Sequence, residues 1–256
     1  MSVLDHPDAA LALRLVEGAG GIAAGWFRRA VPTDTKSNPT DFVTAADREA
    51  EAYVVAQLAR ERPTDGVLGE EGHVVDGSSG RRWVIDPLDG THNFVRGTDW
   101  WCCAVALDGA AGVELGAVRD EVRGRSYVGG PAWGAVVDGT QLAPLVDRPL
   151  AAACAATYLH PPYFHTPVGD AWLRVIDGVG TYRLHGSGTL EAVAIAEGRL
   201  DLFLHHSVPE WDRLPGEAII RAVGGETRTV AAGGVQWYVA GVPTAVAQAS
   251  ARLVNG

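Results

Sequence analysis

The chain has 256 residues, of which 47% are apolar and 20% are charged, so it can bury a large core as one compact unit or two closely packed halves. Its formal net charge of -10 and its lack of a basic stripe exclude nucleic acid as the expected partner, because phosphate backbones are bound by clustered Lys and Arg. No apolar run is long enough to span a bilayer, and MSVLDHPDAA does not have the form of a signal segment, so a cytoplasmic protein with no membrane partner is expected.

Two helices are predicted near the start of the chain. The first covers 8–30, where apolar residues recur at helical spacing and Arg28 and Arg29 suit a helix C-terminus. The second covers 45–62, with Thr44 as its cap and a proline directly after it. Both helices therefore belong to the N-terminal half.

The rest of the N-terminal half is predicted to be mainly β structure. Glycine-rich turns flank a short strand that carries GEEG at 69–72. A further apolar strand begins at Trp83 and runs into two aspartates. Between Trp100 and Leu142, apolar runs alternate with Gly and Asp, which predicts an antiparallel meander.

The second half alternates strands with helices. Strands are predicted over 151–159, 181–186 and 200–206, and helices over 171–179, 188–198 and 212–225. Asp212 is expected to cap the last helix, because Pro215 is tolerated only in a first turn. The whole pattern predicts a layered α+β or α/β sandwich with helix and sheet layers in the order αβαβα. Residues 1–145 would hold a large antiparallel sheet and two helices, and residues 146–256 a smaller mixed sheet between helices, as one compact unit.

The stretch WVIDPLDGTHNFV, residues 83–95, places two aspartates three positions apart at the end of an apolar strand. Two carboxylates about 4 Å apart would repel by roughly 4 kcal/mol at an effective dielectric near 20, so a cation is expected between them. Glu70 and Asp212 stand at the ends of other apolar runs. Hard oxygen donors without histidine or thiol partners favour Mg²⁺, with Mn²⁺ as the alternative, and several carboxylates could hold two or three ions. Pro87 can turn the carbonyl of Leu88 toward the same cation.

Gly90 and Thr91 then begin a predicted short helix, HNFVRG. Amides at a helix start attract anions, and Gly90 permits close approach. Cations beside an anion site indicate a phosphate-binding centre.

Five motifs resemble those of the inositol monophosphatase family of magnesium-dependent, lithium-sensitive phosphatases. They are KSNPTDFVTAADREAE (36–51), GEEG (69–72), WVIDPLDGTHNF (83–94), GSGTLEAVAIAEG (186–198) and EWDRLPGEAIIRAVGG (210–225). Their order and spacing agree over roughly 36–225. The resemblance implies an alternating α and β fold, a homodimer, and a small phosphorylated substrate, with an inositol monophosphate as the best single choice.

The resemblance also implies a role for each motif residue. Glu70, Asp86 and the Leu88 carbonyl would hold one metal ion, Asp86, Asp89 and Asp212 a second, and a third would lie near Glu70. Asp89, Gly90, Thr91 and Asp212 would contact the phosphate or substrate, and Glu70, Thr91 and Asp47 would orient and deprotonate the attacking water. Lys36 lies in the segment that the family places near the metals. The structural alternatives are that Asp47 completes a capping box with Thr44 and that Asp212 is only a helix cap.

The substrate side is less determined. Gly188, Thr189 and Glu191 lie in the segment that faces the alcohol portion of the ester in the family, and the structural alternative is a simple helix cap at that position. His205 occupies the position of a hydroxyl-binding glutamate in animal inositol monophosphatases, and an imidazole cannot reproduce that acceptor geometry. His205 and His206 would therefore contact another polyol, an amino alcohol or a further phosphate; the structural alternative is two partly exposed residues at a strand end.

Three other functions are consistent with parts of the pattern. Relatives with the same metal motif hydrolyse histidinol phosphate, fructose 1,6-bisphosphate or phosphoadenosine phosphate. Paired carboxylates also serve glycoside hydrolases, but that chemistry leaves the Gly90 and Thr91 anion site unexplained. A non-catalytic binding protein on the same fold is the third alternative, and the intact acidic set disfavours it.

Overall fold

The computed structural model of the chain describes residues 2–29, 33–35 and 42–254. The helices are α1 (Ala9–Trp26), α2 (Ala45–Glu61), α3 (Thr91–Val95), α4 (Pro167–Ile176), α5 (Gly188–Ala196), α6 (Glu210–Ala222) and α7 (Pro243–Val254), with short 3-10 helices at Val3–Asp5, Leu150–Ala152 and Pro161–Tyr163. Within these described ranges, no helix is both long and apolar enough to cross a membrane.

Fifteen strands complete the described part of the chain. They are β1 (Thr33–Thr35), β2 (Phe42–Thr44), β3 (Gly66–Gly69), β4 (Val74–Val75), β5 (Arg82–Asp89), β6 (Cys102–Gly109), β7 (Gly112–Asp120), β8 (Arg125–Gly130), β9 (Gly134–Val137), β10 (Thr140–Gln141), β11 (Cys154–Thr157), β12 (Thr181–Arg183), β13 (Leu202–His206), β14 (Glu226–Ala232) and β15 (Val235–Gly241).

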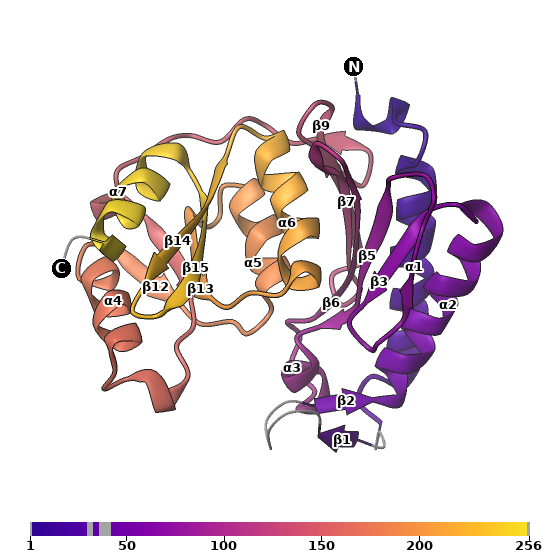
Figure 1. Cartoon of the computed structure of the whole chain (residues 1–256), viewed down its shortest axis with the longest axis horizontal. Helices are drawn as coiled ribbons and strands as arrows, with labels where there is room; N and C mark the ends of the chain where they lie inside the picture. The colour runs from indigo at the N-terminus through magenta and orange to yellow at the C-terminus, as the bar shows by residue number, and fades with distance from the viewer. Residues whose placement is uncertain (1, 30–32, 36–41, 255–256) are drawn as a thin grey trace.

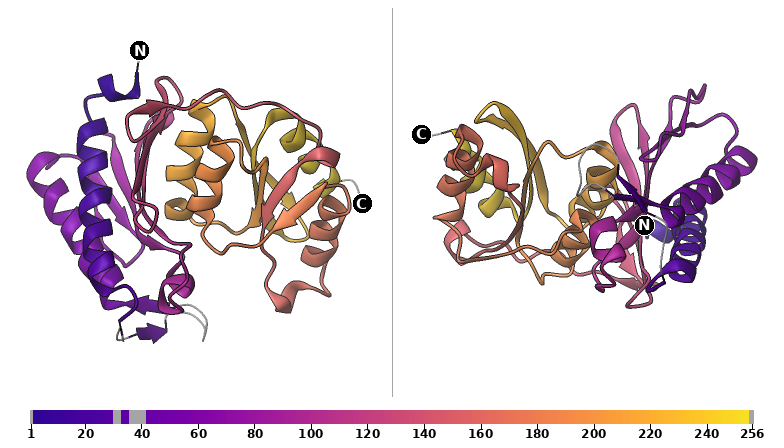
Figure 2. Two further views of the ribbon diagram at one scale, coloured as in Figure 1. Left: turned by 180° about the vertical axis from the view of Figure 1, so that it is seen from behind. Right: turned by 90° about the horizontal axis from the view of Figure 1, so that it is seen from below.

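The elements stack in five layers (Figure 1). Helices α1 and α2 cover the outer face of the large sheet, α5 and α6 lie between the two sheets, and α4 and α7 cover the outer face of the small sheet. The views from behind and from below show the same order (Figure 2). The predicted αβαβα sandwich is therefore confirmed.

The large sheet has the strand order β10-β9-β8-β7-β6-β5-β3-β4. The meander predicted between Trp100 and Leu142 is confirmed as its β6 to β10 portion, all antiparallel. One pair, β3 with β5, is parallel, so the sheet is mixed rather than purely antiparallel. The small sheet, β12-β11-β13-β15-β14, is also mixed, as predicted.

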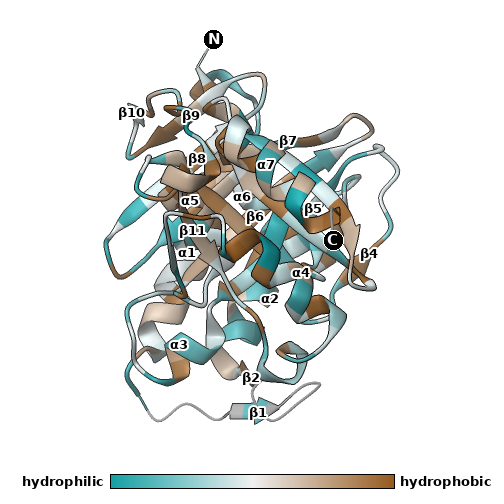
Figure 3. Cartoon of the chain, turned by 90° about the vertical axis from the view of Figure 1, so that its left-hand side faces the viewer, coloured by the Kyte–Doolittle hydropathy of each residue, from teal (hydrophilic) through white to brown (hydrophobic). Residues whose placement is uncertain are grey.

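Apolar residues fill the space between the layers. Helix α5 is buried at every position from Thr189 to Ala196, because it packs against α6 and both sheets rather than facing solvent on one side. Brown, apolar residues run along α5 and the neighbouring strands (Figure 3). Helix α1 shows the one-sided pattern of a surface helix, with Leu11, Leu15 and Ala19 among its buried residues. The layers are thus joined by continuous apolar contact.

Several boundaries differ from the sequence predictions. Of GEEG, only Gly69 lies on a strand, as the last residue of β3, and residues 70–72 form the turn after it. The predicted strand 151–159 divides into a 3-10 helix and the short β11. Helix α6 begins at Glu210, so Asp212 lies in its first turn and is not its cap, and Pro215 lies inside the helix. The hairpin of β14 and β15 and helix α7 were not predicted. The division into halves at residue 145 stays a prediction.

Candidate metal and phosphate site

The end of β5 carries a bulge that sets two carboxylates close together. Asp86 pairs with Ala104 and Asp89 with Cys102, so three steps along β5 face two steps along β6. Pro87 stands inside this irregular stretch, where a missing amide does not break the ladder. Asp86 Oδ1 accepts a hydrogen bond from the Leu88 amide at 3.1 Å, which closes the tight turn. The bulge allows a single strand to place two aspartates close together at its end.

Asp86 is buried, with 1% of its surface exposed. Burial raises its pKa well above 3.8, and the charges of Glu70, Asp89 and Asp212 raise the pKa further. Asp86 Oδ2 has no hydrogen-bond partner in the described part of the chain. Four carboxylates from distant positions therefore act on one another around a buried oxygen that lacks a counter-charge.

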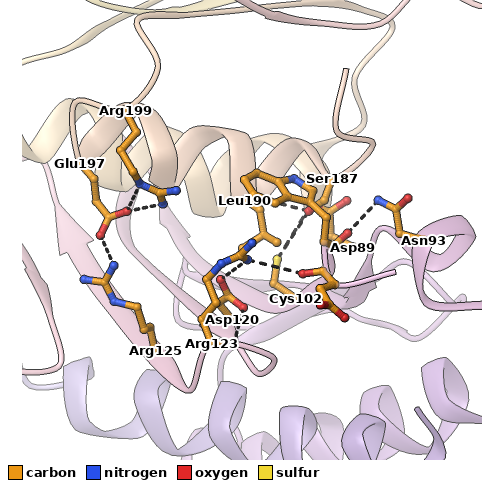
Figure 4. Close-up of polar contacts among 12 residues, drawn as sticks. Asp89, Asn93, Cys102, Asp120, Arg123, Arg125, Ser187, Leu190, Glu197 and Arg199 are labelled. Carbon is orange, nitrogen blue, oxygen red and sulfur yellow. Dashed lines mark hydrogen bonds and ion pairs between the residues drawn. The ribbon is translucent and has the colours of Figure 1, made fainter. Parts of the chain in front are cut away.

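Asp89 is held from the far side of the site. Its Oδ2 accepts hydrogen bonds from the Ser187 hydroxyl and the Thr189 amide, both at 2.7 Å, and the Cys102 sulfur lies at 4.0 Å (Figure 4). Burial raises the pKa of Asp89, although the bonds from Ser187 and Thr189 oppose that effect. Ser187 also caps α5, so the start of α5 is fixed directly to this aspartate.

Gly90 forms the turn between β5 and α3. Its φ of 88° is in the left-handed region, and a Cβ there would lie 2.7 Å from the Trp100 carbonyl oxygen and 3.2 Å from Ser187 Cβ. Glycine is therefore required by both backbone and space. The predicted short helix over HNFVRG is confirmed as α3, which begins at Thr91 directly after this turn.

The Thr91 hydroxyl joins α3 to α2. It lies 2.9 Å from the Leu88 carbonyl oxygen and 3.2 Å from Asp47 Oδ1. The other Asp47 oxygen accepts from the amide and hydroxyl of Thr44, which confirms the capping box at the start of α2. Asp47 thus has the predicted structural role and also contacts Thr91.

Glu70 follows β3, in a turn that is held by hydrogen bonds to Glu51 of α2. No role was predicted for Glu51. Glu51 is fully buried on α2, and its carboxylate accepts from the amides of Glu71 at 2.9 Å and His73 at 3.3 Å. The His73 ring nitrogen Nδ1 lies 2.6 Å away. The spacing of four residues from Asp47, which places both acids on one face of α2, was the available signal.

The residues predicted to contact the substrate lie where α5 begins. A Cβ on Gly188 would lie 3.3 Å from the Phe203 ring and 4.0 Å from the Asp212 carbonyl oxygen. This contact brings the α5 start, β13 and the α6 start together. His205, on β13, stacks on Phe203 and lies 3.3 Å from the buried carboxylate of Glu191. His206 packs against other aromatic rings instead. Lys36 lies outside the described residues.

The donors suit hard divalent cations but do not form a closed coordination shell as they stand. Within the described ranges, no three Asp, Glu, His or Cys side chains are grouped closely enough to hold an ion. The unpaired Asp86 oxygen and the mutual repulsion of four carboxylates nevertheless indicate a missing positive charge. Oxygen donors of this kind fit Mg²⁺ or Mn²⁺.

Comparisons with known proteins identify the family and the fold. The model of the inositol monophosphatase family matches residues 5–254. The chain is 32% identical over 201 residues to the inositol-1-monophosphatase of Rhizobium meliloti, covering 77% of this chain and 75% of that one. It is 30% identical over 230 residues to the Nus factor SuhB of Pseudomonas aeruginosa, covering 86% and 84%. The crystal structure of the extragenic suppressor protein suhB from Bartonella henselae has the same fold, with a TM-score of 0.88, 24% identity and coverage of 96% and 98%.

Proposed function

The chain belongs to the inositol monophosphatase family, and we propose that it is a magnesium-dependent phosphatase that hydrolyses a small phosphate monoester. The observation that carries the proposal is the bulged end of β5. There, the buried and unpaired Asp86 oxygen lies among carboxylates directly before Gly90 and the start of α3. A cation-binding acidic set beside an anion-binding helix start matches the charge pattern of a metal-bound phosphate.

We assign the metal ions, two or three in number, to Glu70, Asp86, Asp89, Asp212 and the Leu88 carbonyl. When bound, such ions lower the pKa of water and neutralise the charge that develops on phosphate and leaving oxygens. Gly90 permits the tight turn into α3, because a side chain there would meet the Trp100 carbonyl oxygen, and this turn would present the amides at the start of α3 to the phosphate. The pair of hydrogen bonds to Asp89 supports its placement at the junction of metal and substrate.

Protein groups would also orient the water. The Thr91 hydroxyl directs its proton toward the Leu88 carbonyl or Asp47, which leaves its oxygen free to accept a hydrogen bond from water. Asp47 is held rigidly by the α2 cap, so it fixes Thr91. Glu70 is the proposed proton acceptor. Hydrolysis would then proceed by direct attack of water on phosphorus, without a phosphoenzyme.

Inositol 1-phosphate is the first substrate choice, supported by the name of the Rhizobium meliloti relative. Histidinol phosphate, fructose 1,6-bisphosphate and phosphoadenosine phosphate are the alternatives, because His205 replaces an acceptor expected in inositol enzymes. The homodimer, lithium inhibition and cytoplasmic location stay predictions from the sequence.

The test is phosphate release from these four esters with Mg²⁺ and with EDTA. We expect one ester to be hydrolysed at least tenfold faster than the others, with loss of turnover in EDTA. Turnover that persists in EDTA would contradict the metal assignment. No release from any ester with Mg²⁺ or Mn²⁺ would contradict the phosphatase proposal and favour a binding protein on this fold.

A further inference from the structure

A buried carboxylate lies between two imidazoles on the substrate side. Glu191, on α5, is fully buried, and its carboxylate oxygens lie 3.3 Å from His185 Nδ1 and 3.3 Å from His205 Nε2. The His185 amide also donates to Glu191 Oε1 at 3.1 Å. His185 precedes α5 and His205 ends β13, so one acid joins two separate segments.

The two histidine nitrogens lie within ion-pair distance of Glu191, but their geometry does not satisfy a hydrogen bond. Glu191 Oε2, His185 Nδ1 and His205 Nε2 are buried and have no hydrogen-bond partner among the described residues, and Thr189 Oγ1 is a fourth such atom close by in sequence. A group of unsatisfied buried polar atoms is rare in folded proteins and requires an explanation. Here the group lies at the start of α5, beside the proposed phosphate site.

Aromatic rings restrict both imidazoles. The Trp100 ring stacks on His185 with centroids 4.3 Å apart, and the Phe203 ring stacks on His205 at 4.1 Å. Each imidazole therefore has one face covered and one ring nitrogen turned toward Glu191. The second ring nitrogen of each imidazole does not face Glu191, and the His185 and His205 side chains keep 26% and 18% of their surface exposed.

The unit is connected to the proposed phosphate loop. The Asn93 side-chain amide, on α3, donates to the carbonyls of Trp100 and His185, each at 2.8 Å. On the other side, Phe203 contacts Gly188 near the Asp212 backbone. The imidazoles thus lie next to the elements assigned to the phosphate, close enough for the rest of a bound ester to meet them.

We propose that Glu191 is a positioning residue for substrate selection, which holds His185 and His205 so that their outer ring nitrogens contact the alcohol portion of the ester. This inference rests on the proposed phosphatase function. Glu191 does not touch the substrate in this account but acts through the two imidazoles.

The electrostatics of Glu191 support this role. Burial alone would raise its pKa, but the contacts with His185 and His205 outweigh burial and lower the pKa. Over the described part of the chain, its ion pairs are with these two histidines and with no Lys or Arg. The imidazoles are thus the groups that keep the buried carboxylate ionised, and Glu191 in turn fixes their orientation.

The test compares kcat/KM for inositol 1-phosphate with kcat/KM for methyl phosphate, whose alcohol portion is a single carbon. We expect Glu191→Gln to lower the ratio of the two values at least tenfold, mainly through KM for the larger ester. His205→Ala should lower the same ratio, and Glu191→Gln should have a smaller effect in the His205→Ala background than in wild type, because only the contact through His185 then remains. Nitrogen-15 NMR of the imidazole rings should show altered His185 and His205 signals in Glu191→Gln.

The matched control is Glu197→Gln, at the opposite end of α5, which removes ion pairs to Arg125 and Arg199 (Figure 4). It should leave the ratio unchanged. If Glu191→Gln does not fold, the same ratio of kcat/KM values is measured for His205→Ala and His185→Ala instead. An active wild-type enzyme whose ratio is unchanged in the folded variants would overturn this inference alone. If another of the four esters is hydrolysed faster than inositol 1-phosphate, that ester replaces it in the ratio. A wild-type protein that hydrolyses none of the four esters would overturn the phosphatase proposal and this inference together.

Discussion

Asp89 Oδ2 accepts a hydrogen bond from the Ser187 hydroxyl at 2.7 Å, across 98 positions of sequence. This contact joins the bulged end of β5 in the large sheet to the start of α5. It places the proposed metal ligand and the substrate-side helix in one rigid unit. The predictions below start from this junction.

Ser187→Ala should weaken both metal binding and folding. The variant removes a hydrogen bond to Asp89 and the cap of α5, so we expect a loss of about 1–2 kcal/mol in the free energy of unfolding. The Mg²⁺ concentration for half-maximal activity should rise about fivefold to tenfold, the equivalent of about 1 kcal/mol in metal affinity. Ser250→Ala removes a buried hydroxyl that bonds to Val246 on α7, and should change stability without changing the Mg²⁺ requirement. Equal Mg²⁺ requirements in the two variants would contradict the role of Ser187.

Glu51→Gln should disturb the turn that carries Glu70. In glutamine one carboxylate oxygen becomes an NH₂ group, which cannot accept a hydrogen bond, so one of the Glu71 and His73 amides loses its partner at a cost of about 1 kcal/mol. We expect activity at low Mg²⁺ to fall at least tenfold, with partial recovery at high Mg²⁺, measured by Mg²⁺ titration of phosphate release. Glu61→Gln, on the same helix in an exposed pair with Arg14, is the control. A normal Mg²⁺ titration in folded Glu51→Gln would show that the turn does not need this carboxylate.

Gly90→Ala should abolish activity through steric conflict. Gly124 has a similar positive φ, of 66°, but open space around it, whereas a Cβ on Gly90 would lie 2.7 Å from the Trp100 carbonyl oxygen. Each substitution costs about 1 kcal/mol through backbone strain, and Gly90→Ala adds the clash. Comparing the two alanine variants by thermal unfolding and phosphate release separates strain from clash. Similar losses in both would mean that close approach at Gly90 is unimportant.

Asp8→Asn should remove an acid-sensitive contribution to stability. Burial alone would raise the Asp8 pKa, but hydrogen bonds from Arg81 and Arg62 outweigh it and lower the pKa below its usual 3.8. The ionised form therefore stabilises the fold above that value, and the stabilisation is lost as pH falls through the lowered pKa. We expect Asp8→Asn to cost about 3 kcal/mol at pH 7 in urea unfolding, and less at low pH.

The exposed Asp177 offers a control for this measurement, because Asp177→Asn replaces an acid outside such a network. Its unfolding free energy should follow the wild-type pH dependence. An Asp8→Asn protein with the same pH dependence as wild type would show that the paired arginines do not act through Asp8.

The repeated patterns made much of this fold predictable. The meander between Trp100 and Leu142 and helix α2 have clear local signals, namely alternating apolar runs and the Thr44 cap. The β14–β15 hairpin was missed because β14 is largely exposed and lacks a clean apolar alternation. Pro215 misled the assignment of α6, since its position suggested a helix start, whereas α6 packing against the large sheet tolerates a proline inside the helix.

The part of the site that one short motif forms was predictable from the sequence. The part that forms where distant segments meet was not. WVIDPLDGT places Asp86, Asp89 and Gly90 within one turn of chain, so local sequence suffices. Glu51 and Glu191 act through contacts over longer separations, with the GEEG turn and with His205. The resemblance places the segment of Glu191 on the substrate side, but no local pattern gives the partners of either acid, because those partners are set by the packing of the layers.

The most direct test of the central claim is Mg²⁺-dependent phosphate release by wild type, Asp86→Asn and the control Asp76→Asn, which changes an exposed acid away from the β5 bulge. We predict that wild type and Asp76→Asn require Mg²⁺ and that Asp86→Asn loses at least 100-fold in kcat/KM while keeping its fold. The loss should occur because Asp86 is the buried oxygen donor around which the other carboxylates gather. A folded Asp86→Asn protein with wild-type turnover and the same Mg²⁺ requirement would contradict the account.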